Sequence, residues 1–71
     1  MMLMYTYKVA WSTEDSAYIA EVAEFPLLKA HGDTPTTALQ EIKVVVAEAV
    51  EDLRELGEPI PQPQSLGAQH D

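Results

Sequence analysis

The sequence predicts a two-layer α+β domain. A three-stranded antiparallel meander with a short fourth edge strand is covered by one long helix, in the order β-β-β-α-β. Residues 4–31 contain three short runs rich in β-favouring side chains, separated by turn-forming clusters. Residues 35–56 carry apolar side chains at three- and four-residue steps, which is typical of an amphipathic helix. The segment between them, residues 32–35, holds the signals that start a helix.

The first two strands are predicted to form a hairpin. In residues 4–11, alternation places Tyr5, Tyr7, Val9 and Trp11 on one side, which we expect to face the core. The polar cluster at residues 12–16 has the length of a hairpin loop, so residues 17–24 should return antiparallel. In this second strand, one face is expected to hold Tyr18, Ala20 and Val22.

A bend and a short third strand are expected next. Pro26 has no N–H to donate to a sheet, so it marks the end of the second strand. Residues 28–31 are then a third strand, and Gly32 closes it as a residue able to take a positive φ.

The helix has clear signals at both ends. Thr34 is a suitable N-cap, Pro35 suits the first helical position, and Asp33 places negative charge beside the positive end of the helix dipole. Gly57 stands where a left-handed glycine usually ends a helix. The expected length of about 22 residues corresponds to roughly 33 Å, enough to cross a small sheet. The apolar stripe consists of Ala38, Leu39, Ile42, Val45, Val46, Ala49, Val50, Leu53 and Leu56.

The chain after the helix is expected to add little. Residues 58–61 contain two prolines and are predicted to form a short edge strand, where proline is tolerated. Residues 62–71 are polar without periodicity, and we expect a mobile tail. The prediction is therefore a single domain over residues 1–61.

Length and composition limit the function classes. A domain of 71 residues buries only about 60% of the surface of its unfolded chain, so a partner or a second copy would add stability. The chain has no cysteine, and hence neither a disulfide nor a thiolate metal site. No apolar run approaches the roughly 20 residues of a membrane span, and no signal peptide is evident. We expect a soluble, cytoplasmic protein.

The chain is strongly acidic. Its 12 acidic and four basic side chains give a net charge of -8. Because this charge repels phosphate backbones, we expect no direct nucleic-acid binding, and we assign the aromatic rings to core or interface packing instead of base stacking. The acidity indicates either a basic protein partner or, more commonly, a surface kept acidic for solubility.

Several short motifs follow one family pattern. They are Tyr7-Lys8-Val9, Tyr18-Ile19-Ala20-Glu21-Val22, Glu24-Phe25-Pro26, and Gly32-Asp33-Thr34-Pro35 followed by Ala38-Leu39. With these motifs, which span residues 5–61, the chain resembles the HicB-like antitoxin family, specifically the N-terminal domain of longer HicB proteins. The resemblance implies a fold like a truncated ribonuclease H domain. It also implies a protein that binds and neutralises a small, basic, RNA-cleaving toxin of the HicA type.

Two features depart from that family. Residues 27–30, Leu-Leu-Lys-Ala, replace a Leu-Pro-Gly-Cys-like bend, so the shape of this turn is not carried over. Longer HicB proteins continue into a DNA-binding module, whereas we expect this chain to be a stand-alone domain. Autorepression is therefore not carried over either.

We expect no catalytic, cofactor or metal site. A two-metal nuclease needs carboxylates converging from the central strand and the helix, and residues 4–12 contain none. His31 is followed by Asp33, a pair that could contribute to a metal site or a general base. Because no third ligand or nucleophile accompanies them, a surface histidine beside a turn is the favoured interpretation.

The helix face opposite the apolar stripe is acidic. An apolar residue within an acidic rim is typical of a docking surface for a basic partner, and the alternative is an ordinary solvated face with one exposed valine. The residues assigned to partner binding are Glu41, Val44, Glu48, Glu51 and Glu55.

Two functions therefore stay open. The first is a non-enzymatic, homo-oligomeric protein that neutralises a small basic HicA-type toxin. The alternative is a self-associating structural or regulatory protein without a toxin partner, which uses its exposed strand edge and aromatic face for self-association.

Overall fold

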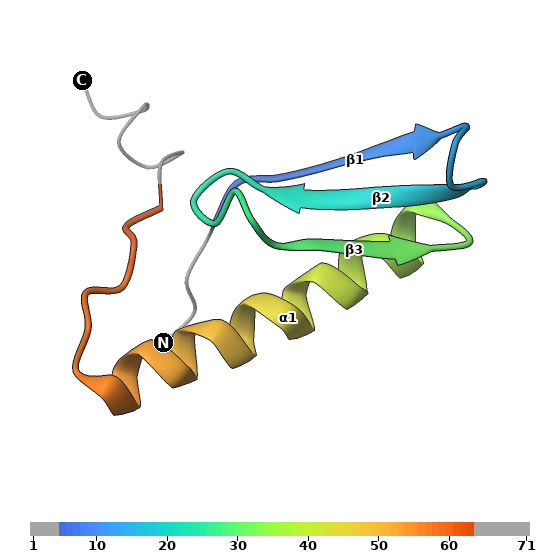
Figure 1. Ribbon diagram of the computed structural model, residues 1–71. Coiled ribbons are helices and arrows are strands. Elements are labelled where there is room, and N and C mark those ends of the chain that lie inside the picture. Colours follow the sequence, from blue (N-terminus) through green and yellow to red (C-terminus); the bar gives the residue numbers. More distant parts are fainter. Residues whose placement is uncertain (1–4, 64–71) are drawn as a thin grey trace, which may run out of the picture.

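The fold has a sheet layer and a helix layer. The computed structural model describes residues 5–63. Three strands, β1 (Tyr7–Ser12), β2 (Ala17–Val22) and β3 (Lys29–Gly32), form an antiparallel sheet in the order β1-β2-β3, and α1 (Pro35–Leu56) lies along one face of it (Figure 1). The predicted α+β meander with one covering helix is confirmed. The predicted fourth strand is not formed. Residues 58–61 are irregular instead.

The β1-β2 hairpin is closed by side chains of its own loop. The Ser12 hydroxyl donates to the Asp15 carboxylate at 2.9 Å and accepts from the Asp15 N–H at 3.3 Å. Ser16 takes a positive φ of 51° before β2 begins. The resulting register pairs Ser12 with Ala17 and Tyr7 with Val22 without interruption. The hairpin loop is therefore residues 13–16, one residue shorter than the predicted 12–16, because Ser12 is the last residue of β1 and pairs with Ala17.

The connection from β2 to β3 is a tight double turn. The Phe25 N–H donates to the Val22 carbonyl at 3.1 Å, and the Leu28 N–H donates to the Phe25 carbonyl at 3.0 Å. Pro26 is exposed at its outer side. As a result β2 ends at Val22, two residues earlier than predicted, and β3 lies one residue later than predicted.

Gly32 is needed for a different reason from the predicted one. Among the described glycines, Gly57 has the positive φ and Gly32 does not. Gly32 is the last residue of β3, and a Cβ built on it would lie 2.8 Å from the Ala38 Cα atom and from the Thr37 carbonyl carbon. The absence of a side chain lets β3 and the first turn of α1 touch.

Both ends of α1 follow the predicted capping pattern. The Thr34 hydroxyl accepts from the Thr37 N–H at 3.1 Å, and Pro35 occupies the first turn. At the other end, Gly57 has a φ of 72° and donates to the Arg54 carbonyl, while the Glu58 N–H donates to the Leu53 carbonyl. This pair of bonds is a Schellman motif, which satisfies the last carbonyls of the helix.

The core lies between α1 and the two strands β2 and β3. Small side chains dominate it, so the helix packs close to the sheet, and α1 contacts β3 most and β1 least. Ile42 and Val22 are the largest fully buried side chains. The buried apolar residues are Tyr5, Ala20, Val22, Ala30, Ala38, Ile42, Val46 and Val50.

Two residues expected in the core are exposed. Trp11 is 54% exposed because it lies on β1, the strand that α1 covers least. Leu56 continues the apolar stripe but is 70% exposed, since the last turns of α1 extend past the sheet (Figure 1). The periodicities that placed both side chains on the core-facing side are correct, but the opposing layer does not reach them.

The segment after α1 returns to the sheet without joining it. Residues 57–63 rise from the end of α1 toward the start of β1 (Figure 1). Ile60 packs against the core, and the Tyr5 hydroxyl donates to the Pro61 carbonyl at 2.8 Å. Core packing and a side-chain hydrogen bond therefore replace the predicted strand pairing. Of the predicted mobile tail at 62–71, residues 64–71 lie outside the described residues.

Candidate protein-binding surfaces

The outward side of α1 carries a continuous acidic stripe. Its members are spaced by three or four residues, so they follow one line along the helix on the side away from the sheet. All of them are exposed, and Val44, with 55% of its surface exposed, is the apolar member. We call Glu41, Val44, Glu48, Glu51 and Glu55 the acidic stripe.

Little compensates the negative charge of this stripe. Glu51 has an exposed contact of 3.8 Å with Arg54, which is one turn away. The pairs Glu48/Asp52 and Glu51/Glu55 are like charges four residues apart, and each such pair destabilises an isolated helix by a few tenths of a kcal/mol. The carboxylates on this side of the helix therefore repel one another, and a basic partner would reduce that repulsion.

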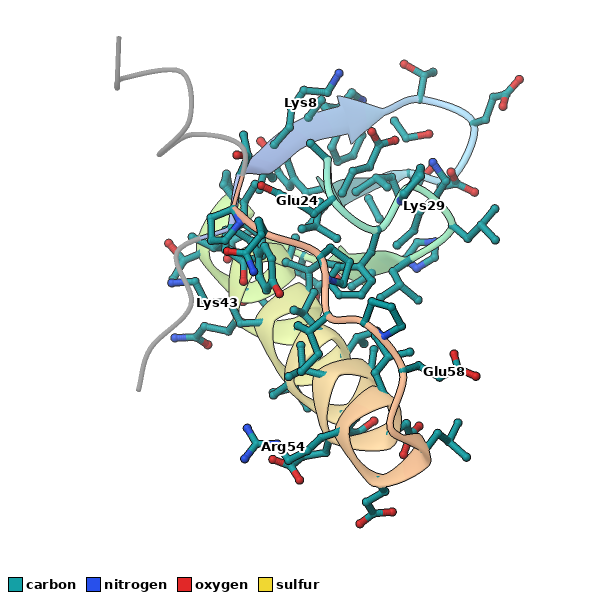
Figure 2. All side chains as sticks on the ribbon, turned by 90° about the vertical axis from the view of Figure 1, so that its left-hand side faces the viewer. Lys8, Glu24, Lys29, Lys43, Arg54 and Glu58 are labelled. Carbon is teal, nitrogen blue, oxygen red and sulfur yellow. The ribbon has the colours of Figure 1, made fainter. Side chains whose placement is uncertain are left out.

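The flank of α1 that faces β1 has the opposite character. Lys43 lies on this flank, because its ammonium group stands 5.7 Å from the centroid of the Tyr7 ring on β1. This distance and geometry fit a cation–π contact. Helical spacing places Thr36, Gln40, Ala47 and Arg54 on the same flank, which holds no acidic residue. Figure 2 shows Lys43 and Arg54 projecting on the same side of the helix.

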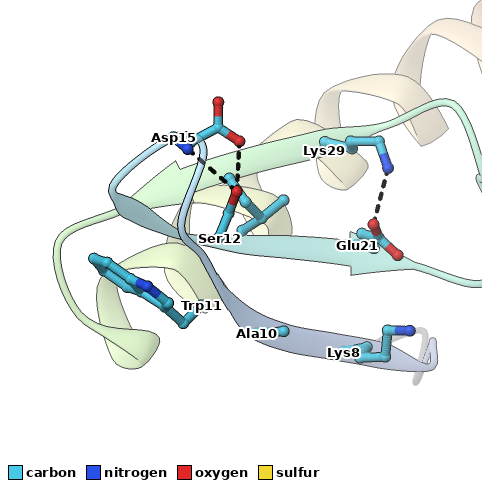
Figure 3. A pocket seen from close by; sticks show the side chains of 8 residues that line it. Lys8, Ala10, Trp11, Ser12, Asp15, Glu21 and Lys29 are labelled. Atoms are coloured by element: carbon cyan, nitrogen blue, oxygen red, sulfur yellow. Dashed lines mark hydrogen bonds and ion pairs between the residues drawn. The ribbon is translucent and has the colours of Figure 1, made fainter.

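The sheet face opposite α1 is open and carries both signs of charge. A shallow depression of about 350 Å³ lies on it (Figure 3). Lys29 on β3 donates to Glu21 on β2 at 2.8 Å, a pair that the register places directly opposite each other. The residues around the depression are Lys8, Ala10, Trp11, Ser12, Asp15, Ile19, Glu21 and Lys29.

The electrostatics of this open face are locally balanced. The hydrogen bond from Lys29, together with its charge and that of Lys8, holds the pKa of the Glu21 carboxyl below its usual value. Both members of the Glu21-Lys29 pair are half-exposed, so water screens the interaction. This face cannot be identified from the sequence, because the pairing of residues 21 and 29 depends on the strand register.

An aromatic pair lies at the hairpin end of the sheet. The rings of Trp11 and Tyr18 meet edge to face with centroids 5.1 Å apart. They are cross-strand partners in the β1-β2 register. Tyr18 also packs against the core, whereas the Trp11 ring keeps half its surface in solvent. Among residues 5–63, Trp11 is therefore the one large aromatic side chain that is exposed, and it lies on the edge strand β1.

A buried carboxylate anchors the start of the described chain. Glu24 accepts from the Thr6 N–H at 3.0 Å and from the Thr6 hydroxyl at 3.0 Å. Burial, and then the charge of Glu24, raises the pKa of both Tyr5 and Tyr7. Glu24 belongs to the Glu24-Phe25-Pro26 motif, but no local pattern predicts that its side chain turns inward to bind Thr6.

The residues that carry the family resemblance have structural positions in the fold. Tyr18 and Gly32 are cross-strand partners, and Ala38, which is fully buried, lies against Gly32. Asp33 and Pro35 are exposed on either side of the N-cap. These residues therefore lie where the sheet meets the helix and where the helix begins.

No chemistry-bearing cluster is brought together in the described part of the chain. His31 is exposed on β3, and Asp33 follows in the exposed connection to α1. Across residues 5–63, no group of three or more histidine, aspartate or glutamate side chains could hold a metal ion. The same residues contain no helix with the length and apolar character required to cross a membrane.

Neither a protein-family model, nor a curated protein sequence, nor a solved structure matches this chain.

Proposed function

We propose that this chain is a non-enzymatic binding protein of the HicB-like antitoxin type, which binds and neutralises a small, basic, RNA-cleaving toxin of the HicA type. The observation that carries the proposal is the acidic stripe of α1. It combines four carboxylates with an exposed valine on the layer of the fold that has solvent on its outer side.

The stripe suits such a partner in two ways. Its charge would accelerate encounter with a basic surface and would exclude acidic competitors. Val44 would supply apolar area between Glu41 and Glu48, and apolar contacts that lose their water contribute most to affinity. The repulsion between neighbouring carboxylates, which the free protein carries, would fall when cationic side chains come between them.

The probe is a short basic protein sought in the reading frame next to this chain. Association is measured by stopped-flow fluorescence at two salt concentrations, and neutralisation by rescue of growth on co-expression. The variant E48K/E51K should slow association at least about tenfold at low salt and abolish rescue. The matched control E14K/E58K makes the same change in net charge away from the stripe and should leave both nearly unchanged.

Three outcomes would contradict the proposal. The wild-type chain could form no complex and give no rescue, or the two double variants could behave alike. The substitution V44D could also leave affinity unaltered, which would exclude a docking surface that buries Val44.

The second candidate is a self-associating structural or regulatory protein without a toxin partner. The exposed Trp11 on an edge strand favours it, since a large aromatic ring at an edge is typical of an interface. The two candidates differ in one readout. A homo-oligomer with no affinity for the neighbouring basic protein supports the second, and a complex with that protein supports the first.

A further inference from the structure

β1 presents an unprotected edge. In the order β1-β2-β3 it has a neighbour on one side, and no strand among residues 5–63 pairs with its other side (Figure 1). Natural edges are usually blunted by proline, by bulges or by several charges. β1 contains no proline, its six residues pair with β2 without a bulge, and Lys8 is its one charge.

The register identifies the backbone groups that point outward. Thr6 is opposite Ala23, whose N–H donates to the Thr6 carbonyl at 2.9 Å, so Thr6 bonds toward β2. Because bonding direction alternates along an antiparallel strand, Lys8 and Ala10 also bond toward β2. The N–H and C=O groups of three alternate residues then point to the free side, namely Tyr7, Val9 and Trp11.

We propose that a second copy of this chain pairs with β1 antiparallel about Val9, which joins the two sheets into one of six strands. In this register Val9 faces Val9, and Tyr7 of each copy faces Trp11 of the other. Six backbone hydrogen bonds form between the copies. The inference does not depend on the antitoxin proposal.

Neighbouring registers are less favourable. Pairing about Ala10 keeps the same faces together but forms four hydrogen bonds. Pairing about Lys8 places two lysines directly opposite each other, which is destabilising. The Val9-centred register also covers the exposed Trp11 ring with a cross-strand Tyr7, and aromatic pairs of this kind stabilise sheets.

The helix layer permits this pairing. α1 packs mainly on β3 and β2 and least on β1, so the two helices would lie apart. The flank of α1 that faces β1 is the one with Lys43 and without acidic residues, whereas the acidic stripe points elsewhere. Two copies of net charge -8 can therefore approach on the side where their negative charge is lowest.

The other edge is a poorer choice. β3 has four residues, and alternation leaves the backbone groups of Lys29 and His31 pointing outward. Asp33 directly follows β3, and helical spacing places Glu41 on the flank of α1 opposite Lys43. Pairing of two copies through β3 would bring these carboxylates together.

A matched pair of proline variants of the full chain tests the proposal. Mass is measured by sedimentation velocity from about 1 to 300 µM, and emission of the sole tryptophan is followed on dilution. V9P removes two symmetry-related N–H donors from the interface, which should raise the dimer dissociation constant about thirtyfold. H31P makes the equivalent change on the β3 edge and should leave the constant unaltered. Proline is tolerated at both positions because both N–H groups point away from β2.

Disulfide trapping gives a second, independent readout of the register. The chain has no cysteine, so V9C introduces a single thiol. Facing residues of a hydrogen-bonded pair have Cα atoms about 5.5 Å apart, which suits a disulfide. V9C should therefore form a covalent dimer faster than A10C or H31C.

A wild-type chain that sediments as a monomer over the whole range overturns the proposal. So does faster trapping of H31C, which would place the contact on β3, or faster trapping of A10C, which would shift the register. If V9P does not fold, the trapping series alone decides.

Discussion

Replacing Gly32 with alanine tests how closely α1 approaches the sheet. The new Cβ would lie 2.8 Å from the Ala38 Cα atom and from the Thr37 carbonyl carbon, and closer still to the Ala38 nitrogen. Cβ atoms essentially never come within 3.0 Å of such neighbours. All three are backbone atoms, held by the Thr34 cap, so no change of rotamer relieves the contact.

The expected cost is large for a domain of this size. Overpacking of a filled site costs about 1–3 kcal/mol, and a clash with backbone belongs at the upper end, about 3 kcal/mol. A chain of 71 residues has a total unfolding free energy of about 4–10 kcal/mol. G32A should therefore remove a third or more of it and lower Tm by about 12–24 °C.

Urea and thermal unfolding followed by circular dichroism measure the effect. Gly57 supplies the control, since its φ is 72° and a Cβ there meets nothing within 4 Å. G57A should cost about 1–2 kcal/mol from backbone strain alone, and asparagine at this position should recover part of that loss. At Gly32, asparagine should be at least as harmful as alanine. A G32A protein within about 0.5 kcal/mol of wild type would refute the reasoning.

Three further substitutions, with V44A as a control for the first, test the packing and electrostatics. I42A removes a fully buried side chain and should destabilise the fold by about 2–5 kcal/mol in urea unfolding, whereas the exposed V44A should change stability by less than about 0.5 kcal/mol. Y5F removes the hydrogen bond to Pro61 and should cost about 1 kcal/mol at neutral pH. Folding raises the pKa of Tyr5 and Tyr7, so the stability that their neutral rings provide is complete below pH 10 and is lost as pH rises further. The free energy of unfolding should therefore fall less steeply above pH 10 in Y5F than in wild type. K29M should return the lowered pKa of Glu21 toward its ordinary value of 4.5 in an NMR titration. Since a lowered pKa contributes stability that is lost as pH falls through the folded-state value, the wild-type chain should lose more stability than K29M in acid.

The helix could be predicted from the sequence because its signals are local. Thr34 and Pro35 act within one turn of the start. At the end, the Gly57 N–H bonds to the carbonyl three residues earlier, and the Glu58 N–H bonds to the carbonyl five residues earlier. The acidic stripe follows directly, since helical spacing alone decides which side chains share a line. Its role in binding stays a prediction.

Features that depend on how the layers meet could not be predicted. Periodicity placed Trp11 and Leu56 on the core-facing side, but it carries no information on how far the opposing layer extends. The sequence predicts glycine at position 32 for its backbone freedom, whereas its neighbour in space, Ala38, sets the requirement. Residues 58–61 were expected to extend the sheet, and their attachment instead rests on Ile60 packing and on the distant Tyr5 hydroxyl.

The open sheet face depends on register for the same reason. Glu21 and Lys29 are eight residues apart, and only the length of the β2-β3 turn determines that they face each other. The outward direction of the Tyr7, Val9 and Trp11 backbone groups likewise follows from one hydrogen bond at Thr6.

The Tyr5–Pro61 hydrogen bond has a mechanical consequence. It joins residues 56 positions apart, so handles attached near Tyr5 and Pro61 would pull on the molecule from one corner. Tension would open that bond first and then peel β1 from β2 one backbone bond at a time, beginning at Thr6. A tethered molecule should consequently unzip at low force, without the high rupture peak of strands that are sheared along their length.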